Sequence, residues 1–289
     1  LCNSDKARKI FVSYNMHGRH MQSLEDKFGI CRCEDCGVIF IADIEVNQKY
    51  YKKYYPKSYY ENIENTVLRN IFKIIGKLSV AYKQRQIMRN TVRKQNEKIK
   101  ILDVGCGNGD YLRAIDNERF EKFGIEINPE GYKICKEKGI NVYNQEIQNI
   151  NFKGIQFDIV TLWHVLEHLE NPIEIIKLIN KILVKDGLLV ISTPNTDSIG
   201  FKYGKEYWFH LDSPRHLMLY NMKSLKNMLG VFRLEILSKK SIILDYPLDL
   251  FWSVRKSWIR YLIYPIYPIL RIFYQESLFI FAQKKGEIF

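Results

Sequence analysis

The chain has 289 residues, a hydrophobic fraction of 46% and a formal net charge of +12. This composition is typical of a globular protein with one large domain and an appendage. Residues 46–100 contain 14 Lys or Arg and 3 Glu, so this segment alone carries +11. That concentration argues against a wholly basic nucleic-acid binder and indicates one basic element. Six cysteines in a chain this long favour a reducing compartment and a metal over a disulfide framework.

Residues 1–45 are predicted to form a small Cys-rich segment. The string Cys33-Glu-Asp-Cys36-Gly places two thiolates three residues apart, a spacing typical of a zinc knuckle. Cys2 would be a third ligand of a structural zinc ion. The fourth ligand is either Cys31 or a cysteine upstream of the first residue, because the chain begins with Leu rather than Met and we expect an earlier start. The alternative is a set of free thiols.

Residues 46–97 are the basic element. Pairs of tyrosines separated by lysines open it, and helical spacing of apolar residues predicts a helix from about 65 to 96. Its arginines recur every four residues, at Arg85, Arg89 and Arg93. This face is either solvated or part of a lid whose cations meet an anionic acceptor, such as a nucleotide sugar or a lipid head group. Lysines and aromatics can also bind nucleic acid by stacking, but no recognisable nucleic-acid module supports such a partner.

A strand, a glycine turn and a helix start follow one another at 101–115. Ile101–Val104 is a short apolar run typical of a buried parallel strand, and Asp103 lies near its end. The turn contains Gly105, Gly107 and Gly109. Glycines let the backbone approach a ligand closely, and the first turn of a helix has free amide donors. The segment therefore predicts a nucleotide-type site.

The glycine spacing favours S-adenosylmethionine over a dinucleotide. A dinucleotide loop has the pattern Gly-x-Gly-x-x-Gly, but here the third glycine comes one residue early and Asp110 takes its place. A carboxylate repels a pyrophosphate and attracts a sulfonium and an ammonium group. Asp103 and the three glycines resemble the class I S-adenosylmethionine-dependent methyltransferases. An NAD-linked dehydrogenase is disfavoured, and a non-catalytic scaffold with this fold is a further alternative.

This resemblance implies further cofactor contacts. Glu126 ends the next strand, 17 residues after Gly109, where an acid can accept hydrogen bonds from both ribose hydroxyls. Residues after the third strand flank the adenine in such enzymes, and the fourth strand ends beside the sulfonium. The other positions assigned to cofactor binding in this way are Cys106, Ile127, Gln145, Glu146 and Trp163.

The string His164-Val-Leu-Glu167-His168 follows the fourth strand. On a helix these three polar residues would share a face and could bind one metal ion. The string matches an inverted zinc-peptidase motif, which we reject because a peptidase needs no cofactor loop. It also resembles the Glu-x-x-Glu-His segment of ubiquinone-type O-methyltransferases, in which these residues are associated with a divalent cation. His164 in place of the first Glu disfavours magnesium and favours a softer ion.

Three histidines are candidate bases for removing a proton from an acceptor hydroxyl: His164, His210 and His216. The last two lie in a loop, residues 209–217, that resembles the His-x-x-x-Pro-x-His-Leu loop of small-molecule methyltransferases. The resemblance places this loop on the acceptor side, where Arg215 could hold an acidic acceptor. For His164 and His168, packing between elements is the alternative role.

Alternating strands and helices over residues 98–195 predict an α/β fold, a parallel sheet with helices on both faces. The resemblance to class I methyltransferases implies a Rossmann-like sheet of about seven mostly parallel strands, the last one antiparallel. The expected domains are 1–45, 46–97 and 98–289. The segment Phe251–Tyr274 is rich in aromatic residues. Its longest charge-free run, Tyr261–Leu270, has 10 residues with two prolines and is too short to span a membrane. We favour an insertion packed on the core over an interfacial patch that faces lipid.

Together these features predict methyl transfer from S-adenosylmethionine to a hydroxyl group of a sugar, lipid-linked or quinone-like small molecule. C- or N-methylation of a nucleotide sugar is the alternative. The Cys-rich start followed by a Tyr-rich segment also resembles methyltransferases that act on sugars. Because residues 1–15 are polar and basic, without the apolar stretch of a signal peptide, we expect a cytoplasmic protein. Peripheral contact with the inner face of a membrane is an open alternative.

Overall fold

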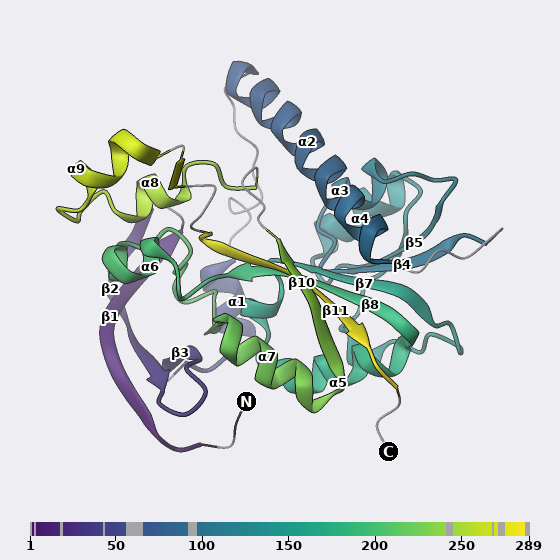
Figure 1. Cartoon of the computed structure of the whole chain (residues 1–289), viewed down its shortest axis with the longest axis horizontal. Coiled ribbons are helices and arrows are strands. Elements are labelled where there is room, and N and C mark those ends of the chain that lie inside the picture. Colours follow the sequence, from purple (N-terminus) through teal and green to yellow (C-terminus); the bar gives the residue numbers. More distant parts are fainter. Residues whose placement is uncertain are drawn as a thin grey trace.

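The computed structural model describes residues 2, 4–17, 20–42, 44–55, 66–91, 97–240, 245–267, 269–270 and 275–286. A seven-stranded sheet is the centre of the molecule (Figure 1). Its strands are, in spatial order, β10 (Leu234–Lys240), β11 (Ser277–Lys284), β8 (Leu183–Pro194), β7 (Phe157–Trp163), β4 (Ile99–Val104), β5 (Phe120–Ile125) and β6 (Asn141–Tyr143). Only β11 runs antiparallel to the other six. The predicted class I sheet is confirmed.

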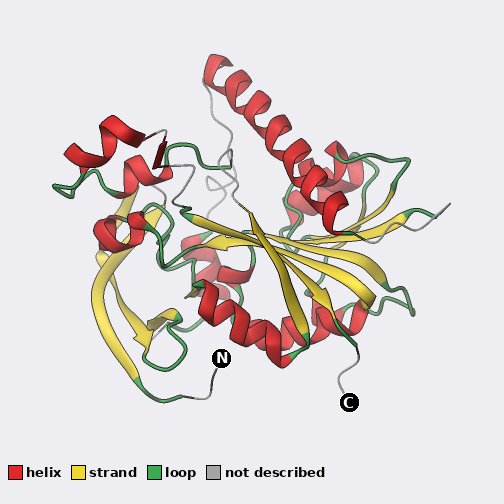
Figure 2. Ribbon diagram, viewed as in Figure 1, coloured by secondary structure: helices red, strands yellow, loops and turns green. Residues whose placement is uncertain are grey.

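Helices cover both faces of this sheet (Figure 2). The helices on one face are α2 (Thr66–Asn90), α3 (Asp110–Ala114) and α4 (Pro129–Glu137). Those on the other face are α5 (Pro172–Ile182) and α7 (Met222–Val231). Ile101 and Leu102 illustrate how the strands build two cores, because neighbouring side chains of a strand point to opposite faces. Both are fully buried, Ile101 beneath α3 and Leu102 on the α5 side.

A second, antiparallel sheet has four strands in the order β1 (Ala7–His17), β2 (His20–Cys33), β3 (Ile39–Ala42) and β9 (Met218–Leu219). Helix α1 (Gln48–Tyr54) follows β3, and its Tyr50 and Tyr54 are buried against Leu217. The N-terminal residues therefore pack around the loop that precedes β9. The tyrosines of α1 thus contribute to a core, whereas Tyr59 and Tyr60 lie outside the described residues.

The helix predicted from about 65 to 96 is present as α2, which buries Ile87 completely and exposes Arg85 and Arg89. Residues 56–65 and 92–96 of this element, including Arg93, lie outside the described residues. The short helical elements are η2 (Ile147–Asn149), η3 (Leu166–His168), α6 (Ile199–Gly204), η4 (Lys205–Tyr207), α8 (Asp249–Ser253), α9 (Arg260–Ile263) and η5 (Tyr264–Ile266). Among the described residues, no helix combines the length and apolar character needed to cross a membrane.

Candidate active site

The glycine loop connects β4 to α3 in a conformation that only glycine adopts easily. Gly105, Gly107 and Gly109 all have positive φ, at +70°, +56° and +70°. A Cβ on Gly109 would lie 2.2 Å from Ile140 Cδ1, so this glycine permits close packing inside the protein. A Cβ on Gly107 would meet no atom within 4 Å. Gly107 therefore faces open space, as a ligand-binding loop requires.

Asp103 lies at the end of β4 and is only 2% exposed. Its Oδ1 accepts a hydrogen bond of 2.6 Å from Thr161 Oγ1 on the neighbouring strand β7. Burial raises the pKa of the Asp103 carboxyl to about 7, although the Thr161 hydroxyl and the charge of Lys83 lower it. A cationic ligand beside this carboxyl would favour its ionised form.

Glu126 follows β5 and is fixed against the glycine loop. Its Oε2 accepts a 2.7 Å hydrogen bond from the Gly107 amide, and its Oε1 accepts one of 2.7 Å from the Asn128 amide. A carboxylate oxygen has a second lone pair, so both oxygens can still accept hydroxyl donors. Ile127, next in the chain, is 54% exposed and offers an apolar surface beside the carboxylate.

The other positions predicted for the cofactor lie as follows. Gln145 and Glu146 follow β6 and are both exposed. Cys106 lies under the loop: its amide donates to Ile125 O, and its Sγ lies 3.9 Å from the Cys135 Sγ of α4. The Cys106 side chain thus supports the loop from inside rather than facing the ligand side.

Trp163 ends β7 and contacts helix α2. Its indole packs edge-on against Tyr111, and the Lys83 ammonium of α2 lies 4.5 Å from its ring centroid. The Trp163 Nε1 is buried without a hydrogen-bond partner. Lys83 also forms a 2.8 Å ion pair with Asp245. The spacing of Lys83 in the sequence does not distinguish it from the other cations of α2.

A cavity of about 210 Å³ lies beside Lys83, between α2 and the segment after β10. Its lining residues are Ile75, Gly76, Ser79, Val80, Lys83, Asp245 and Pro247. Apolar groups form most of this lining, and Ser79, Lys83 and Asp245 are its polar members. Because Lys83 also contacts Trp163, the cavity adjoins the cofactor half of the site.

His164, which is half-buried, and the fully buried Glu167 form a pair directly after β7. His164 Nδ1 lies 3.2 Å from Glu167 Oε1, and His164 Nε2 lies 3.1 Å from Ser192 Oγ. Glu167 is fully buried and accepts a second hydrogen bond from Thr193 Oγ1 at 3.0 Å. Burial raises the pKa of Glu167, but the hydrogen bond from His164 and the charges of neighbouring imidazoles outweigh it, and the pKa falls to about 2.

The expectation that His164, Glu167 and His168 share one helix face is wrong. The helical turn η3 begins only at Leu166, and His164 has the left-handed φ of +54°. Instead, Glu167, His168 and His216 offer ligand atoms within 4.8 Å of one another. His168 Nδ1 lies 2.9 Å from Arg215 O, and His216 Nδ1 lies 2.7 Å from His210 O. A carbonyl only accepts, so Nδ1 carries the proton and each neutral ring keeps its Nε2 lone pair.

The loop 209–217 brings the other predicted bases together, but in buried positions. His210 Nε2 lies 3.0 Å from Asp249 Oδ2, and the His210 ring stacks on His164 at a centroid distance of 6.4 Å. The Tyr246 ring contacts both histidines edge-on. Burial, followed by the charge of His168, lowers the pKa of His216 to about 4.

Arg215 does not point toward an acceptor. It is 2% exposed, and its Nε and Nη2 donate to the Asp212 carboxylate at 3.0 Å each. Its Nη1 donates to Tyr54 O at 3.2 Å. Asp212 also contacts His17 Nδ1 of β1 at 3.0 Å. Arg215 therefore connects the loop to the N-terminal sheet, which sequence spacing alone could not indicate.

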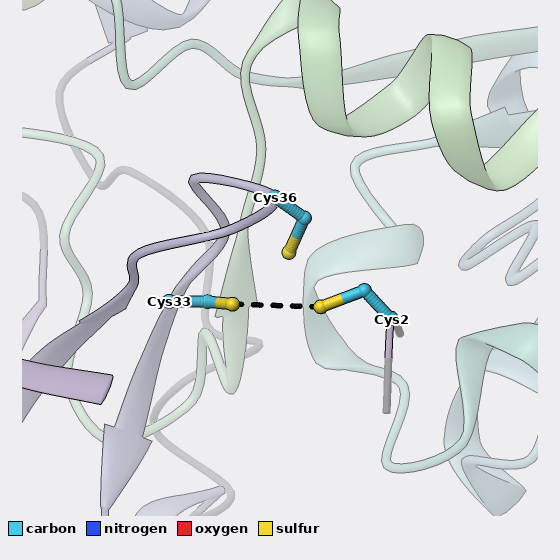
Figure 3. A group of neighbouring side chains, drawn as sticks. All are labelled: Cys2, Cys33 and Cys36. Atoms are coloured by element: carbon cyan, nitrogen blue, oxygen red, sulfur yellow. Dashed lines mark hydrogen bonds between the residues drawn. The ribbon is translucent and has the colours of Figure 1, made fainter. Parts of the chain in front are cut away.

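The cysteines at the turn between β2 and β3 approach Cys2, as predicted (Figure 3). Cys2 Sγ lies 3.5 Å from Cys33 Sγ, and Cys36 completes a group within 4.8 Å. The backbone amide of Cys36 lowers the pKa of the Cys33 thiol to about 7, against the effect of burial. Cys31 is not part of this group.

The parallel sheet, the glycine loop after β4 and the acids at the ends of β4 and β5 define the class I S-adenosylmethionine-dependent methyltransferases. A sequence-family model described as a methyltransferase domain matches residues 80–239, more than half of the chain. The chain belongs to this methyltransferase-domain family.

Curated relatives match the central part of the chain. A ubiquinone biosynthesis O-methyltransferase of Haemophilus ducreyi is 31% identical over 107 residues, which are 33% of this chain and 45% of the relative. A carboxy-S-adenosyl-L-methionine synthase of Campylobacter hominis is 32% identical over 111 residues, 35% of this chain and 46% of the relative. The chain thus matches about half the length of these relatives.

Solved structures agree on the fold. Magnesium protoporphyrin IX methyltransferase from Synechocystis PCC 6803 with bound SAH has a TM-score of 0.54 and 12% identity, over 82% of this chain and 100% of that chain. The plantazolicin methyltransferase BamL, in complex with a triazolic desmethylPZN analog and SAH, has a TM-score of 0.52 and 16% identity, over 80% and 94%. At sequence identities of 12% and 16%, the similarity to these two structures establishes the fold and nothing more.

Proposed function

We propose that this protein transfers a methyl group from S-adenosylmethionine to a hydroxyl group of a small molecule. The observation that carries this proposal is the His164–Glu167 pair beside the glycine loop. A Cβ on Gly105 would lie 2.6 Å from Val165, the residue after His164, so the pair directly adjoins the loop. A base next to a cofactor site suits acceptors that must lose a proton.

The residues around the loop fit S-adenosylmethionine. A cationic nucleoside could occupy the open space at Gly107. It could also accept a hydrogen bond from the unpartnered Nε1 of Trp163 and pair with the buried carboxyl of Asp103. Asp103 would hold the cationic amino-acid part, and Glu126 the ribose. Bound S-adenosylmethionine supplies an electrophilic methyl group on its sulfonium. The protein mainly positions the acceptor and excludes water around it.

His164 is the base that the hydrogen bonds support best. Because Glu167 is ionised, it can only accept, so His164 Nδ1 carries the proton. The neutral ring then presents its Nε2 lone pair, which faces the Ser192 hydroxyl and could receive a proton from an acceptor hydroxyl instead. His216 is a weaker base because its pKa is lowered to about 4. His210 is buried, with its Nε2 against Asp249.

Two metal sites belong to this proposal. Cys2, Cys33 and Cys36 are thiol ligands suited to a structural zinc ion. A divalent cation would be held by Glu167, His168 and His216 rather than by His164, since the Nδ1–H···O=C contacts of both histidines orient Nε2 as a ligand. Two imidazoles and one carboxylate favour a transition metal over magnesium.

The acceptor proposals are a sugar, a lipid-linked compound or a quinone-like compound, with C- or N-methylation of a nucleotide sugar as the alternative. The similarity to a ubiquinone biosynthesis O-methyltransferase supports the quinone-like class. The net charge of +11 on residues 46–100 supports an anionic acceptor. A cytoplasmic location is part of the same proposal.

Methyl-labelled S-adenosylmethionine tests the proposed activity. The protein is incubated with an extract of its source cells, and label is followed into the organic and aqueous phases. Label in the organic phase, or in an aqueous product separated from unreacted S-adenosylmethionine, supports methyl transfer. The phase separates lipid or quinone acceptors from sugars. His164→Asn should lower turnover at least about a hundredfold while cofactor affinity stays unchanged. Cofactor binding without transfer to any acceptor would favour the scaffold alternative.

A further inference from the structure

The insertion between β10 and β11 has two distinct faces. Its inner face packs on the protein: Leu250, Val254 and Ile263 are at most 4% exposed and form one apolar cluster. Tyr264 Oη donates to Phe251 O at 3.1 Å, and Tyr267 Oη donates to Pro247 O at 2.5 Å. The insertion is thus held in a defined shape, as the packing prediction expected. Within Phe251–Tyr274, Pro268 and residues 271–274 lie outside the described residues.

The outer face of this insertion is apolar and exposed. We call it the outer patch and define it as Leu248 (52% exposed), Trp258 (69%), Tyr261 (69%), Leu262 (60%), Ile266 (46%) and Ile269 (59%). These are six of the 13 large hydrophobic side chains that are exposed among the described residues. Scattered exposed apolar residues are normal, whereas such a concentration marks an interaction surface. Helices α8 and α9 form a corner of the molecule, away from the large sheet (Figure 1).

The charges around the outer patch favour an anionic partner. The cations of the segment 245–270 are the exposed Lys256 and two half-buried arginines, Arg255 and Arg260. Each arginine also donates to a backbone carbonyl of this segment, at 2.7 Å. Its carboxylates are Asp245 and Asp249, which contact Lys83 at 2.8 Å and His210 at 3.0 Å. The Arg260 guanidinium lies 4.6 Å from the ring centroid of Tyr261, at the patch itself. An apolar surface with cations at its edge, and carboxylates engaged inside, complements an anionic lipid surface.

The outer patch continues toward the cavity beside Lys83. Pro247 lines this cavity and directly precedes Leu248. On α2, Ile74 and Leu78 are 61% and 55% exposed, each one position before the cavity residues Ile75 and Ser79. We propose that the outer patch lies on the surface of an anionic phospholipid bilayer, with this cavity next to the membrane. The docking does not depend on the proposed methyl transfer. If the acceptor is lipid-linked, the cavity would be its route from the membrane, and this further step depends on the proposed function.

Sedimentation of the full chain with lipid vesicles tests the docking. The probes are vesicles of phosphatidylglycerol mixed with phosphatidylcholine, and vesicles of phosphatidylcholine alone. The patch variant carries Trp258→Ser, Leu262→Ser and Ile269→Ser. The control variant carries the same change at exposed apolar residues elsewhere, Leu24→Ser, Val231→Ser and Leu237→Ser. Because no methyl transfer is measured, failure of the proposed activity does not affect this experiment.

The wild type and the control variant should bind the anionic vesicles equally, and the patch variant at least about tenfold more weakly. Reversing two charges, Lys256→Glu with Arg260→Glu, should also weaken binding about tenfold. Equal sedimentation of the patch variant and the wild type would overturn the proposal. A wild type that binds neither kind of vesicle would also overturn the proposal. Self-association through the patch in sedimentation velocity would then identify a second copy as the occupant.

Discussion

The carboxyl of Asp103 should make cofactor binding depend on pH. In the free protein burial raises its pKa to about 7, so near pH 6 most molecules carry a protonated Asp103. The cationic part of S-adenosylmethionine interacts favourably with the carboxylate and not with the acid. Binding therefore requires loss of this proton, and the affinity should fall as the pH is lowered through about 7.

The size of this effect follows from the pKa. When only the ionised form binds, the apparent dissociation constant increases by the factor 1 + 10^(pKa − pH), which is about 11 at pH 6 and about 1.1 at pH 8 for a pKa of about 7. We expect roughly tenfold weaker binding at pH 6, equivalent to about 1.4 kcal/mol. The free energy of unfolding depends on pH in the opposite direction. Because the carboxyl pKa is raised in the folded state, the unliganded protein becomes less stable as the pH rises from about 4 to about 7.

Calorimetric titration with S-adenosylmethionine between pH 6 and pH 8 measures this dependence, and buffers of different ionisation enthalpy report the released proton. Asp103→Asn should weaken binding and remove the pH dependence. Thr161→Val removes a hydrogen bond that lowers the pKa, so the midpoint should move to higher pH. Glu276→Gln is the matched control, because Glu276 also titrates near pH 7 but contacts Trp208 and Ser198 instead of the loop. A wild-type affinity that is flat across this range would refute the reasoning.

Three further outcomes are expected. Gly109→Ala should destabilise the protein by about 2 kcal/mol more than Gly107→Ala in urea unfolding, because both have positive φ but only Gly109 lacks space for a Cβ. Burial and the charge of Asp249 raise the pKa of Glu276 to about 7, so unfolding free energy should fall between about pH 5 and pH 7, and less so in Glu276→Gln. Cys33→Ser should abolish zinc in elemental analysis, whereas Cys31→Ser should not.

The large sheet was predictable because each of its strands carries a strong local signal. The apolar run at Ile101–Val104, the glycines after it and the acid Glu126 fix where strands end and which edge they share. Strand β8 begins at Leu183, earlier than the apolar run indicates. Its start and the helix bounds depend on hydrogen bonds that residue spacing does not encode. The single antiparallel strand was implied by the resemblance to class I methyltransferases, whereas the spatial order of the strands was not predicted.

The N-terminal sheet was not predicted. Strands β1 and β2 are long, but their residues do not alternate strictly between apolar and polar, because the pairing is interrupted by bulges near Ile10 and Tyr14. The short partner β9 contributes only two residues, from a part of the chain almost 180 residues away. Likewise, His216 lies close to Glu167 although the two are far apart in the sequence. The prediction used a local helix pattern, so it placed His164 in the metal group instead of His216.

The N-terminal sheet and the histidine loop are physically one unit. Ile39 pairs with Leu219, the Met16 amide donates to Ser213 O at 2.9 Å, and Arg215 binds backbone carbonyls of the N-terminal segment. The cysteine group lies at the turn where β2 leads to β3, far from the glycine loop in sequence. A zinc ion there would therefore act through the sheet, because constraining β2 and β3 also constrains the strand β9 that follows His216. The Cys-rich segment would thus help to position His216, a proposed metal ligand.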